Sequence, residues 1–504
     1  MRCPKCGTEN PDDVQICSTC GYVPKSDAAD KPTAKPKTSR LAIASLVLSI
    51  FGLFTFLITA LISIALGITS LCRIKKQKAE LKGKYIAVTG IAVSLVCILV
   101  FVAAFVLWGL DTPPIPDDYT TADLRSAPPD CEKSYELLKT LVGSKQDSGE
   151  ASAIGLSEQD INTIDQVDEV IEEGDFSKIT EVLEANADNI QQAWKNAQKA
   201  RDIISELNTF PEIADLTEPT VNTDIINFMN LIKLAHLFQA YFYLKIQQDD
   251  VEPAIRELTE FDSVVRKFSI NARPLIAKLA CCVCLTTNIT TANAIVNSSS
   301  VSQETVGFLA EHFPPLTNEH TSLQNPVLSE YLILKDVDTR VLDKRRMGYN
   351  LFLKSNSTLR LYRNLCDDWI ATLQGHENSK RLPLSVWPSR FLDRLPVSIG
   401  SRGRVPWYYM CYNPVGSMLI QMLTPGFEST LDKRDVIKVQ DDLLQIVLNK
   451  RLGNEVSLKA RAYSDEYIID TEKKIIYSPG PDGKPNTKDD IKLMINPEVL
   501  NFTN

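Results

Sequence analysis

Four cysteines within the first twenty residues have the spacing of metal ligands. They are Cys3, Cys6, Cys17 and Cys20, arranged as two C-x2-C pairs separated by ten residues. Such pairs form two turns whose sulfurs meet at one tetrahedral centre, which predicts a structural zinc site. About 25 residues bury too little apolar surface to fold alone, so the metal would supply most of the folding energy. Two disulfides are the alternative, and they would require an oxidising compartment.

The first 24 residues resemble the short zinc-ribbon domain that begins many bacterial membrane proteins, through the motifs CPKCG and CSTCG. The resemblance implies a closed site, in which four thiolates leave the metal no open position for catalysis. The ribbon itself contains only two basic residues, Arg2 and Lys5, which disfavours nucleic acid as its partner. We therefore expect a protein-contact module or a simple cap, followed by a flexible basic linker over residues 25–40.

After the ribbon and its linker, the sequence predicts a membrane domain over residues 41–110. Two uncharged apolar runs, 41–71 and 86–110, are separated by a basic loop over 72–85. A helix needs about 20 apolar residues to cross the hydrocarbon core, so each run predicts a transmembrane helix. Neither run contains an ionisable group, which disfavours a transporter or a proton pathway.

This membrane region is similar to an uncharacterised family with two membrane helices and a small basic loop. The motifs that carry the resemblance are SLVLSIFGL, IALGITSLCRIKK and GKYIAVTGIAVS. The resemblance implies an architecture and no activity. Two pairs of small residues, Ser63/Gly67 and Gly90/Ser94, would let the helices pack closely, although small residues also occur on lipid-facing helices.

The charges beside the two runs predict an orientation but also a conflict. The positive-inside rule places the basic loop in the cytoplasm and residues 111–504 outside. The segment before residue 41 is also basic, and a ribbon of free thiolates prefers a reducing compartment. Either the first run returns as a hairpin around Gly52 to Thr55, or both helices cross and one basic flank lies outside.

The rest of the chain is acidic and mainly helical in pattern. Residues 1–110 contain 13 Lys and Arg against 6 Asp and Glu, whereas residues 111–504 contain 41 against 57. A proline-rich stalk is expected over 111–130, and a large α-helical domain over 131–453. Its clearest helix start is Ser157, an N-cap residue followed by Glu158 and Asp160.

One predicted helix pair, residues 223–248 with 251–268, is similar to a tetratricopeptide hairpin, but no regular repeat follows, so an irregular helical domain is expected. Helix-pair surfaces of this kind commonly bind peptides or proteins. The motif LACCVCL places Cys281, Cys282 and Cys284 on one helix, where buried packing is expected. A disulfide to Cys366 or Cys411 is the alternative for an exported domain.

Residues 454–504 predict short strands, giving a small β hairpin at the C-terminus. The stretch IIYSPGPDGKPNTKDDI is similar to the carboxy-terminal strand and loop of type II secretion pseudopilins, a loop that can hold calcium. The resemblance implies Asp482, Asp489 and Asp490 as candidate calcium ligands, together with backbone carbonyls. A hairpin loop with solvated acids is the alternative.

The whole sequence therefore predicts a multidomain membrane protein with structural zinc and no motif of a known active site. It has no nucleophile elbow, P-loop, HExxH or dinucleotide-binding fingerprint, so we expect no enzyme. The predicted function is a membrane-anchored interaction or scaffold protein of the cell membrane, whose large extracytoplasmic domain binds proteins or peptides. The alternatives are a hydrolase whose site only the fold assembles, and a scaffold with both termini in the cytoplasm.

Overall fold

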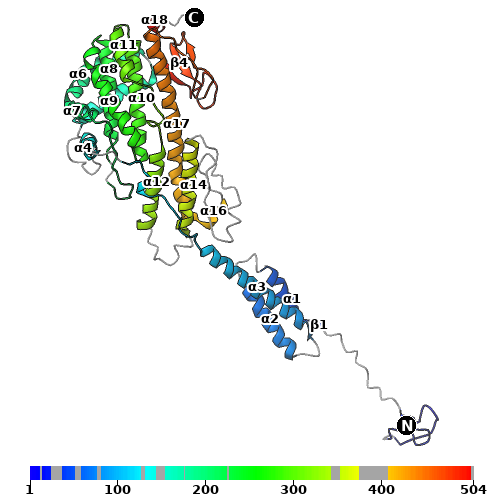
Figure 1. Cartoon of the computed structure of the whole chain (residues 1–504). Coiled ribbons are helices and arrows are strands. Elements are labelled where there is room, and N and C mark those ends of the chain that lie inside the picture. Colours follow the sequence, from blue (N-terminus) through cyan, green and yellow to red (C-terminus); the bar gives the residue numbers. More distant parts are fainter. Residues whose placement is uncertain are drawn as a thin grey trace. The chain divides into compact units, whose positions relative to one another are not determined.

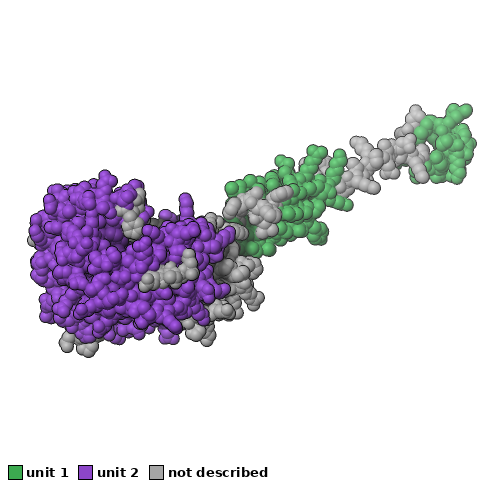
Figure 2. All heavy atoms as spheres, turned by 90° about the horizontal axis from the view of Figure 1, so that it is seen from above, with its two compact units in different colours: residues 1–109 green, residues 110–504 purple. Residues whose placement is uncertain are grey.

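The computed structural model describes two compact units, residues 1–109 and residues 110–504 (Figure 2). The described residues are 1–11, 14–23, 37–51, 58–76, 81–126, 131–143, 154–174, 176–223, 226–341, 352–373, 407–461 and 463–500. The turn expected around Gly52 to Thr55 and most of the linker at 25–40 lie outside these residues. We describe each unit separately.

The first unit contains the cysteine ribbon and a bundle of three helices that pack against one another (Figure 1). Its elements are β1 (Lys37–Thr38), α1 (Arg40–Phe51), α2 (Ile58–Lys76), β2 (Leu81–Lys82) and α3 (Lys84–Gly109). The first apolar run therefore forms two helices where the sequence allowed one crossing or a hairpin. The serine contacts between α1 and α2, described below, show that these two helices run in opposite directions.

The second unit is mainly helical, as the sequence predicts. Its elements up to residue 341 are η1 (Thr121–Asp123), α4 (Cys131–Val142), α5 (Glu158–Glu173), α6 (Phe176–Asn196), α7 (Gln198–Asn208), α8 (Met229–Gln247), η2 (Glu252–Ala254), α9 (Ile255–Asn271), α10 (Leu275–Asn297), α11 (Gln303–His312), α12 (Gln324–Asp336) and η3 (Val337–Val341). The remaining elements are α14 (Ser355–Leu373), α16 (Trp407–Tyr412), α17 (Pro414–Arg451), β3 (Ile468–Asp470), β4 (Ile475–Ser478), β5 (Ile491–Met494) and α18 (Pro497–Leu500).

Local sequence signals explain several helix ends. Ser157 and Asp160 form the predicted capping box of α5: the Ser157 hydroxyl accepts from the Asp160 backbone N–H at 3.1 Å, and the Asp160 carboxylate accepts from the Ser157 N–H at 2.8 Å. Gly174 ends the same helix in the left-handed region, with φ of 73°. Ala197 separates α6 from α7.

The largest core of the second unit surrounds α10, which packs against α8, α9 and α17. Cys281, Cys282 and Cys284 lie in this core and are buried with free thiols, so the packing prediction is confirmed. α8 and α9 contact each other through stacked Phe238 and Phe261, whose centroids are 4.7 Å apart. A second core lies among α12, α14, α16 and α17.

The expected C-terminal hairpin is a three-stranded antiparallel sheet in the order β3-β4-β5. Its side chains Ile476, Ile491 and Leu493 belong to the same core as α10. The Asn293 side-chain amide of α10 donates to the Met494 carbonyl of β5 at 2.8 Å. Residues 454–500 are therefore part of the helical unit, where the sequence suggested a separate segment.

The segment expected to be a proline-rich stalk runs along α12 and α14 within the second unit. The Arg360 guanidinium donates to the Pro113 carbonyl at 2.9 Å, and Lys335 pairs with Asp118 at 2.7 Å. Leu124 is buried in the second core. Proline exposes carbonyl acceptors and gives no N–H, so arginine and lysine side chains on the two helices can hold this extended path.

Candidate zinc centre and apolar helix bundle

The two cysteine pairs form two turns with matching hydrogen bonds. In the first turn, the Gly7 N–H donates to the Cys3 carbonyl at 2.9 Å; in the second, the Gly21 N–H donates to the Cys17 carbonyl at 2.9 Å. Gly7 and Gly21 both have positive φ, 76° and 64°, a backbone region that suits glycine. The glycine that follows each cysteine pair therefore completes the turn, and the turn orients the two thiols.

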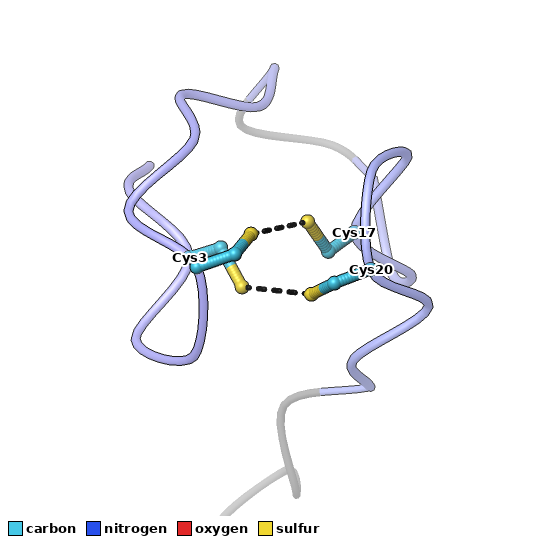
Figure 3. Close-up of side chains that lie close together, drawn as sticks. Cys3, Cys17 and Cys20 are labelled. Atoms are coloured by element: carbon cyan, nitrogen blue, oxygen red, sulfur yellow. Dashed lines mark hydrogen bonds between the residues drawn. The ribbon is translucent and has the colours of Figure 1, made fainter.

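The four sulfur atoms converge on one centre (Figure 3). Cys3 Sγ lies 3.7 Å from Cys20 Sγ, and Cys6 Sγ lies 3.5 Å from Cys17 Sγ; all four lie within 4.8 Å of one another. Zinc–sulfur bonds of about 2.3 Å in a tetrahedron imply sulfur separations of about 3.8 Å. These cysteines thus fit a zinc ion, and in the described parts of the chain they form the only group of three or more His, Cys, Asp or Glu whose ligand atoms were found this close together.

Neighbouring donors stabilise negative charge on these sulfurs. The backbone N–H groups of Thr19 and Cys20 lower the pKa of the Cys17 thiol to about 6, and the side-chain amide of Asn10 donates to Cys17 Sγ at 3.4 Å. The adjacent Cys6 thiol raises the pKa of Cys20 to about 12, because neighbouring sulfurs resist a second charge. A divalent cation would remove that repulsion and hold all four as thiolates.

Asn10 connects the two turns, a role that the cysteine spacing did not indicate. Its backbone N–H donates to the Met1 carbonyl at 2.9 Å. Its side-chain oxygen accepts from the Ser18 N–H at 3.2 Å and from the Ser18 hydroxyl at 3.0 Å. The side chain is buried between the two turns. An Asn between two C-x2-C pairs, four residues after the second cysteine, is the only sequence signal for this role.

The helix bundle has small, partly polar residues inside. One serine from each helix meets in the centre: the Ser63 hydroxyl donates to the Ser45 carbonyl at 2.6 Å, and the Ser94 hydroxyl donates to Ser63 Oγ at 2.9 Å. Nearer the start of α1, the Ser70 hydroxyl donates to Ser39 Oγ at 3.1 Å. Ser39 contacts Ser70 and Ser45 contacts Ser63, so residues later in the α1 segment meet residues earlier in α2. The helices α1 and α2 are therefore antiparallel. All these serines are buried.

Two predicted small-residue positions allow this close packing. A Cβ atom on Gly90 would lie 2.6 Å from Ser45 Oγ and 3.1 Å from the Leu46 backbone nitrogen. A Cβ on Gly67 would lie 2.6 Å from an Ile91 side-chain carbon. The two distances of 2.6 Å are too short for real contacts, so the bundle requires glycine at both positions. Gly67, Ser63, Gly90 and Ser94 therefore pack between helices, which is one of the two interpretations that the sequence left open.

The outside of the bundle is apolar, the reverse of a water-soluble bundle. The large apolar side chains that point outward are Ile43, Val47, Ile50, Ile58, Leu61, Ile62, Ile68, Val88, Leu95, Val96, Leu99, Val100, Val102, Phe105 and Val106. α2 and residues 84–103 of α3 are long and apolar enough to cross a membrane. α10 also meets this criterion, but it is mostly buried in the second unit.

The basic residues gather at one end of the bundle. β1 pairs in parallel with β2, which aligns Thr38 with Lys82, and the Ser39 N–H donates to the Lys82 carbonyl at 3.0 Å. The start of α1 therefore lies beside the loop between α2 and α3. The charged residues described at this basic end are Lys37, Arg40, Arg73, Lys75, Lys76, Lys82 and Lys84. The two flanks that conflicted in the sequence lie together.

The three candidate calcium residues lie in the β4–β5 loop around Thr487. The Thr487 hydroxyl lies 2.6 Å from Asp489 Oδ1, 3.4 Å from Asp490 Oδ1 and 3.5 Å from Asp482 Oδ1. Gly480 lies against the Asp489 backbone, where a Cβ would clash with its carbonyl. The loop thus brings the three residues near one hydroxyl, and calcium binding stays a prediction.

Comparisons with known proteins match two short parts of the chain. Residues 2–23 match a zinc-ribbon domain, and residues 41–104 match a domain of unknown function, DUF4190. No curated protein and no solved structure matches the chain. Together with the four clustered cysteines and the apolar helices, these matches are consistent with zinc binding and indicate a membrane-associated protein.

Proposed function

We propose that this protein is a membrane-anchored interaction protein, with the zinc ribbon in the cytoplasm and residues 110–504 on the other side of the membrane. One observation carries the proposal: the bundle has an apolar outside and collects both basic segments at one end. Such an end favours the cytoplasmic surface.

The path of the three helices supports this orientation. α1 begins at the basic end, and α2 returns to it. α3 also begins there and continues for 26 residues, about 39 Å of helix, which exceeds a hydrocarbon core of about 30 Å. An α1–α2 hairpin followed by one crossing through α3 would satisfy both basic flanks at once. The sequence alone left this arrangement and a two-crossing arrangement open.

An interaction role agrees with the ribbon, whose four thiolates leave no catalytic position, and with the large helical unit. The hydrolase alternative would need a pocket with converging titratable groups. One open hollow of about 360 Å³ beside α17 contains Asp442, Arg461 and Tyr467. However, Asp442 already accepts from Tyr467 at 2.7 Å and pairs with Arg461 at 3.1 Å, so we assign it no catalysis.

Cysteine labelling in intact cells tests the orientation. Lys82→Cys reports the basic end and Glu304→Cys reports the second unit; both positions are exposed. The exposed Cys72 and Cys411 are first replaced by serine. We expect a membrane-impermeant maleimide to label residue 304 in intact cells and residue 82 only after lysis. Labelling of both positions only after lysis would support the cytoplasmic scaffold instead.

The binding role needs its own measurement. Cross-linking of the full chain in its membrane, followed by identification of attached proteins, should give partners that are lost when residues 131–500 are deleted and kept when the ribbon cysteines are changed to serine. The opposite pattern would assign binding to the ribbon. A chain that attaches nothing above the level of an unrelated membrane anchor would contradict the interaction role.

We also propose calcium binding by the β4–β5 loop, supported by the grouping of Asp482, Asp489 and Asp490 around Thr487. Calcium titration of the full chain by calorimetry should show a binding event that Asp489→Asn removes. Glu472→Gln, an exposed acid in the neighbouring β3–β4 turn, is the matched control. Equal heats for both variants and the unaltered chain would refute the loop assignment.

A further inference from the structure

The second unit exposes large apolar side chains where three of its helices begin. Phe352 is 61% exposed, Met418 63%, Met410 44% and Val415 37%. They belong to the residue stretch before α14, to α16 and to the start of α17. Elsewhere in this unit, most large apolar side chains are buried in its cores.

Asn413 brings these segments together. Its side-chain oxygen accepts from the Lys354 N–H at 2.9 Å and from the Gly416 N–H at 3.2 Å. Its amide donates to the Thr358 hydroxyl at 2.7 Å and to the Tyr409 hydroxyl at 3.1 Å. Each exposed apolar residue lies within five positions of this network in the chain. The four exposed side chains, Phe352, Met410, Val415 and Met418, therefore lie on segments that Asn413 joins, and we call this group the apolar pole.

The chain that leaves α3 enters the second unit at this same pole. Leu110 follows the last residue of α3, and its carbonyl accepts from the Tyr412 hydroxyl at 3.0 Å. The Asp111 carboxylate accepts from the backbone N–H groups of Asn356 at 2.8 Å and Ser357 at 3.1 Å. It thereby caps the start of α14. A helix that crosses a bilayer ends at its surface, so Leu110 and the residues bonded to it lie near that surface.

The sequence of the pole is also unsuited to bulk water. From residue 405 to residue 427 the chain carries no charged side chain, although 23% of the whole chain is charged. α16, with the sequence WYYMCY, is uncharged throughout, and the first turn of α17 contains no acidic residue. Exposed apolar patches mark sites that contact a membrane or another protein, and Phe and other large apolar side chains form the buried face of helices in the interfacial layer of a membrane.

We propose that this apolar pole contacts the lipid bilayer, with Phe352, Met410 and Met418 inserted among the headgroups and upper acyl chains. The proposal rests on the membrane anchoring proposed above. It commits to lipid because the covalent connection to α3 brings the pole to the bilayer surface. Helices in this layer lie roughly 5–10 Å into the boundary of headgroups and acyl chains.

Spin labels on the full-length, zinc-loaded chain test the proposal in vesicles of phosphatidylcholine and phosphatidylglycerol. Cys72 and Cys411 are replaced by serine, and single cysteines are placed at Phe352 or Met418 for labelling. Power saturation then compares access of oxygen, which enters lipid, with access of a water-soluble nickel chelate. Leu99→Cys, on the outer face of α3, reports lipid, and Glu304→Cys, in the first turn of α11, reports water.

We expect labels at residues 352 and 418 to favour oxygen and to give depths of roughly 5–10 Å below the phosphates. The label at residue 304 should favour the nickel chelate. If residue 99 lies in lipid while 352 and 418 match residue 304, the pole is in water and this inference is overturned. If residue 99 itself lies in water, membrane anchoring fails as well. Labels at 352 and 418 that neither reagent reaches would indicate a protein cover and also overturn it.

Discussion

Replacing Asn10 by alanine should weaken zinc binding although no ligand is removed. The substitution deletes the N–H donor to Cys17 Sγ and the acceptor for Ser18, the contacts that connect the two cysteine turns. A hydrogen bond to a charged group contributes about 1.5–3 kcal/mol. At about 1.4 kcal/mol for each tenfold change, the dissociation constant should rise about 10- to 100-fold. This range agrees with the usual effect of residues that orient metal ligands.

Competition with a chromogenic zinc chelator measures this effect on the reduced full chain at neutral pH. Glu9→Gln is the matched control, since it lies next to Asn10 but pairs only with Arg2 in an exposed ion pair. Exposed pairs contribute about 0–1 kcal/mol, so the control should stay within a fewfold of the unaltered chain. If Asn10→Ala binds zinc as tightly as Glu9→Gln does, Asn10 does not orient the site and the reasoning is refuted.

Three further substitutions test the bundle and the helical unit. Gly90→Val should destabilise the bundle by about 1–3 kcal/mol, because α1 must move away from the added side chain. The control Val96→Leu, on the outer face of α3, should leave the stability nearly unchanged. Detergent-driven unfolding measures both. Asn413→Ala should lower the free energy of unfolding by about 2–5 kcal/mol, because it leaves two buried N–H groups unpaired. The control Ser302→Ala removes an exposed helix cap and should lower it by about 1 kcal/mol. Denaturant unfolding measures both. Burial raises the pKa of Asp441 from 3.8 to about 6, so the native state holds a proton that the unfolded state releases, and stability should fall as pH rises from about 4 to 6. Asp441→Asn should remove that part of the pH dependence in the same unfolding experiment, and an unchanged slope would contradict the assignment.

Local signals in the sequence were sufficient wherever one short motif determines the geometry. The spacing of the cysteines predicted their convergence, and Ser157 with Asp160 predicted the start of α5. The small pairs Ser63/Gly67 and Gly90/Ser94 made close packing one of two open interpretations, because a helix can approach another only where side chains are small.

Features that depend on distant partners could not be predicted in this way. The role of Asn10 follows from its contacts with Cys17 and Ser18 in the second cysteine turn, which only the folded chain brings beside it. The path of residues 110–126 depends on Arg360 and Lys335, which are more than 200 positions away in the chain. The parallel pairing of Thr38 with Lys82 brings the two basic flanks of the bundle together, and two-residue strands leave no pattern in a sequence.

The burial of α10 has a consequence for the synthesis of this protein. By hydropathy α10 could be taken for a transmembrane segment. In the orientation proposed above the second unit is exported, and its apolar stretches would be presented to the translocation machinery during synthesis. Lys278, Asn288 and Asn293 interrupt its apolar surface, and a lysine within a membrane segment costs several kcal/mol for insertion. In the folded unit Lys278 donates to the Ser269 and His320 carbonyls, Asn288 to Asp262, and Asn293 to Met494. The polar side chains that are bonded in the core are thus also the ones that would keep α10 from stopping in the membrane.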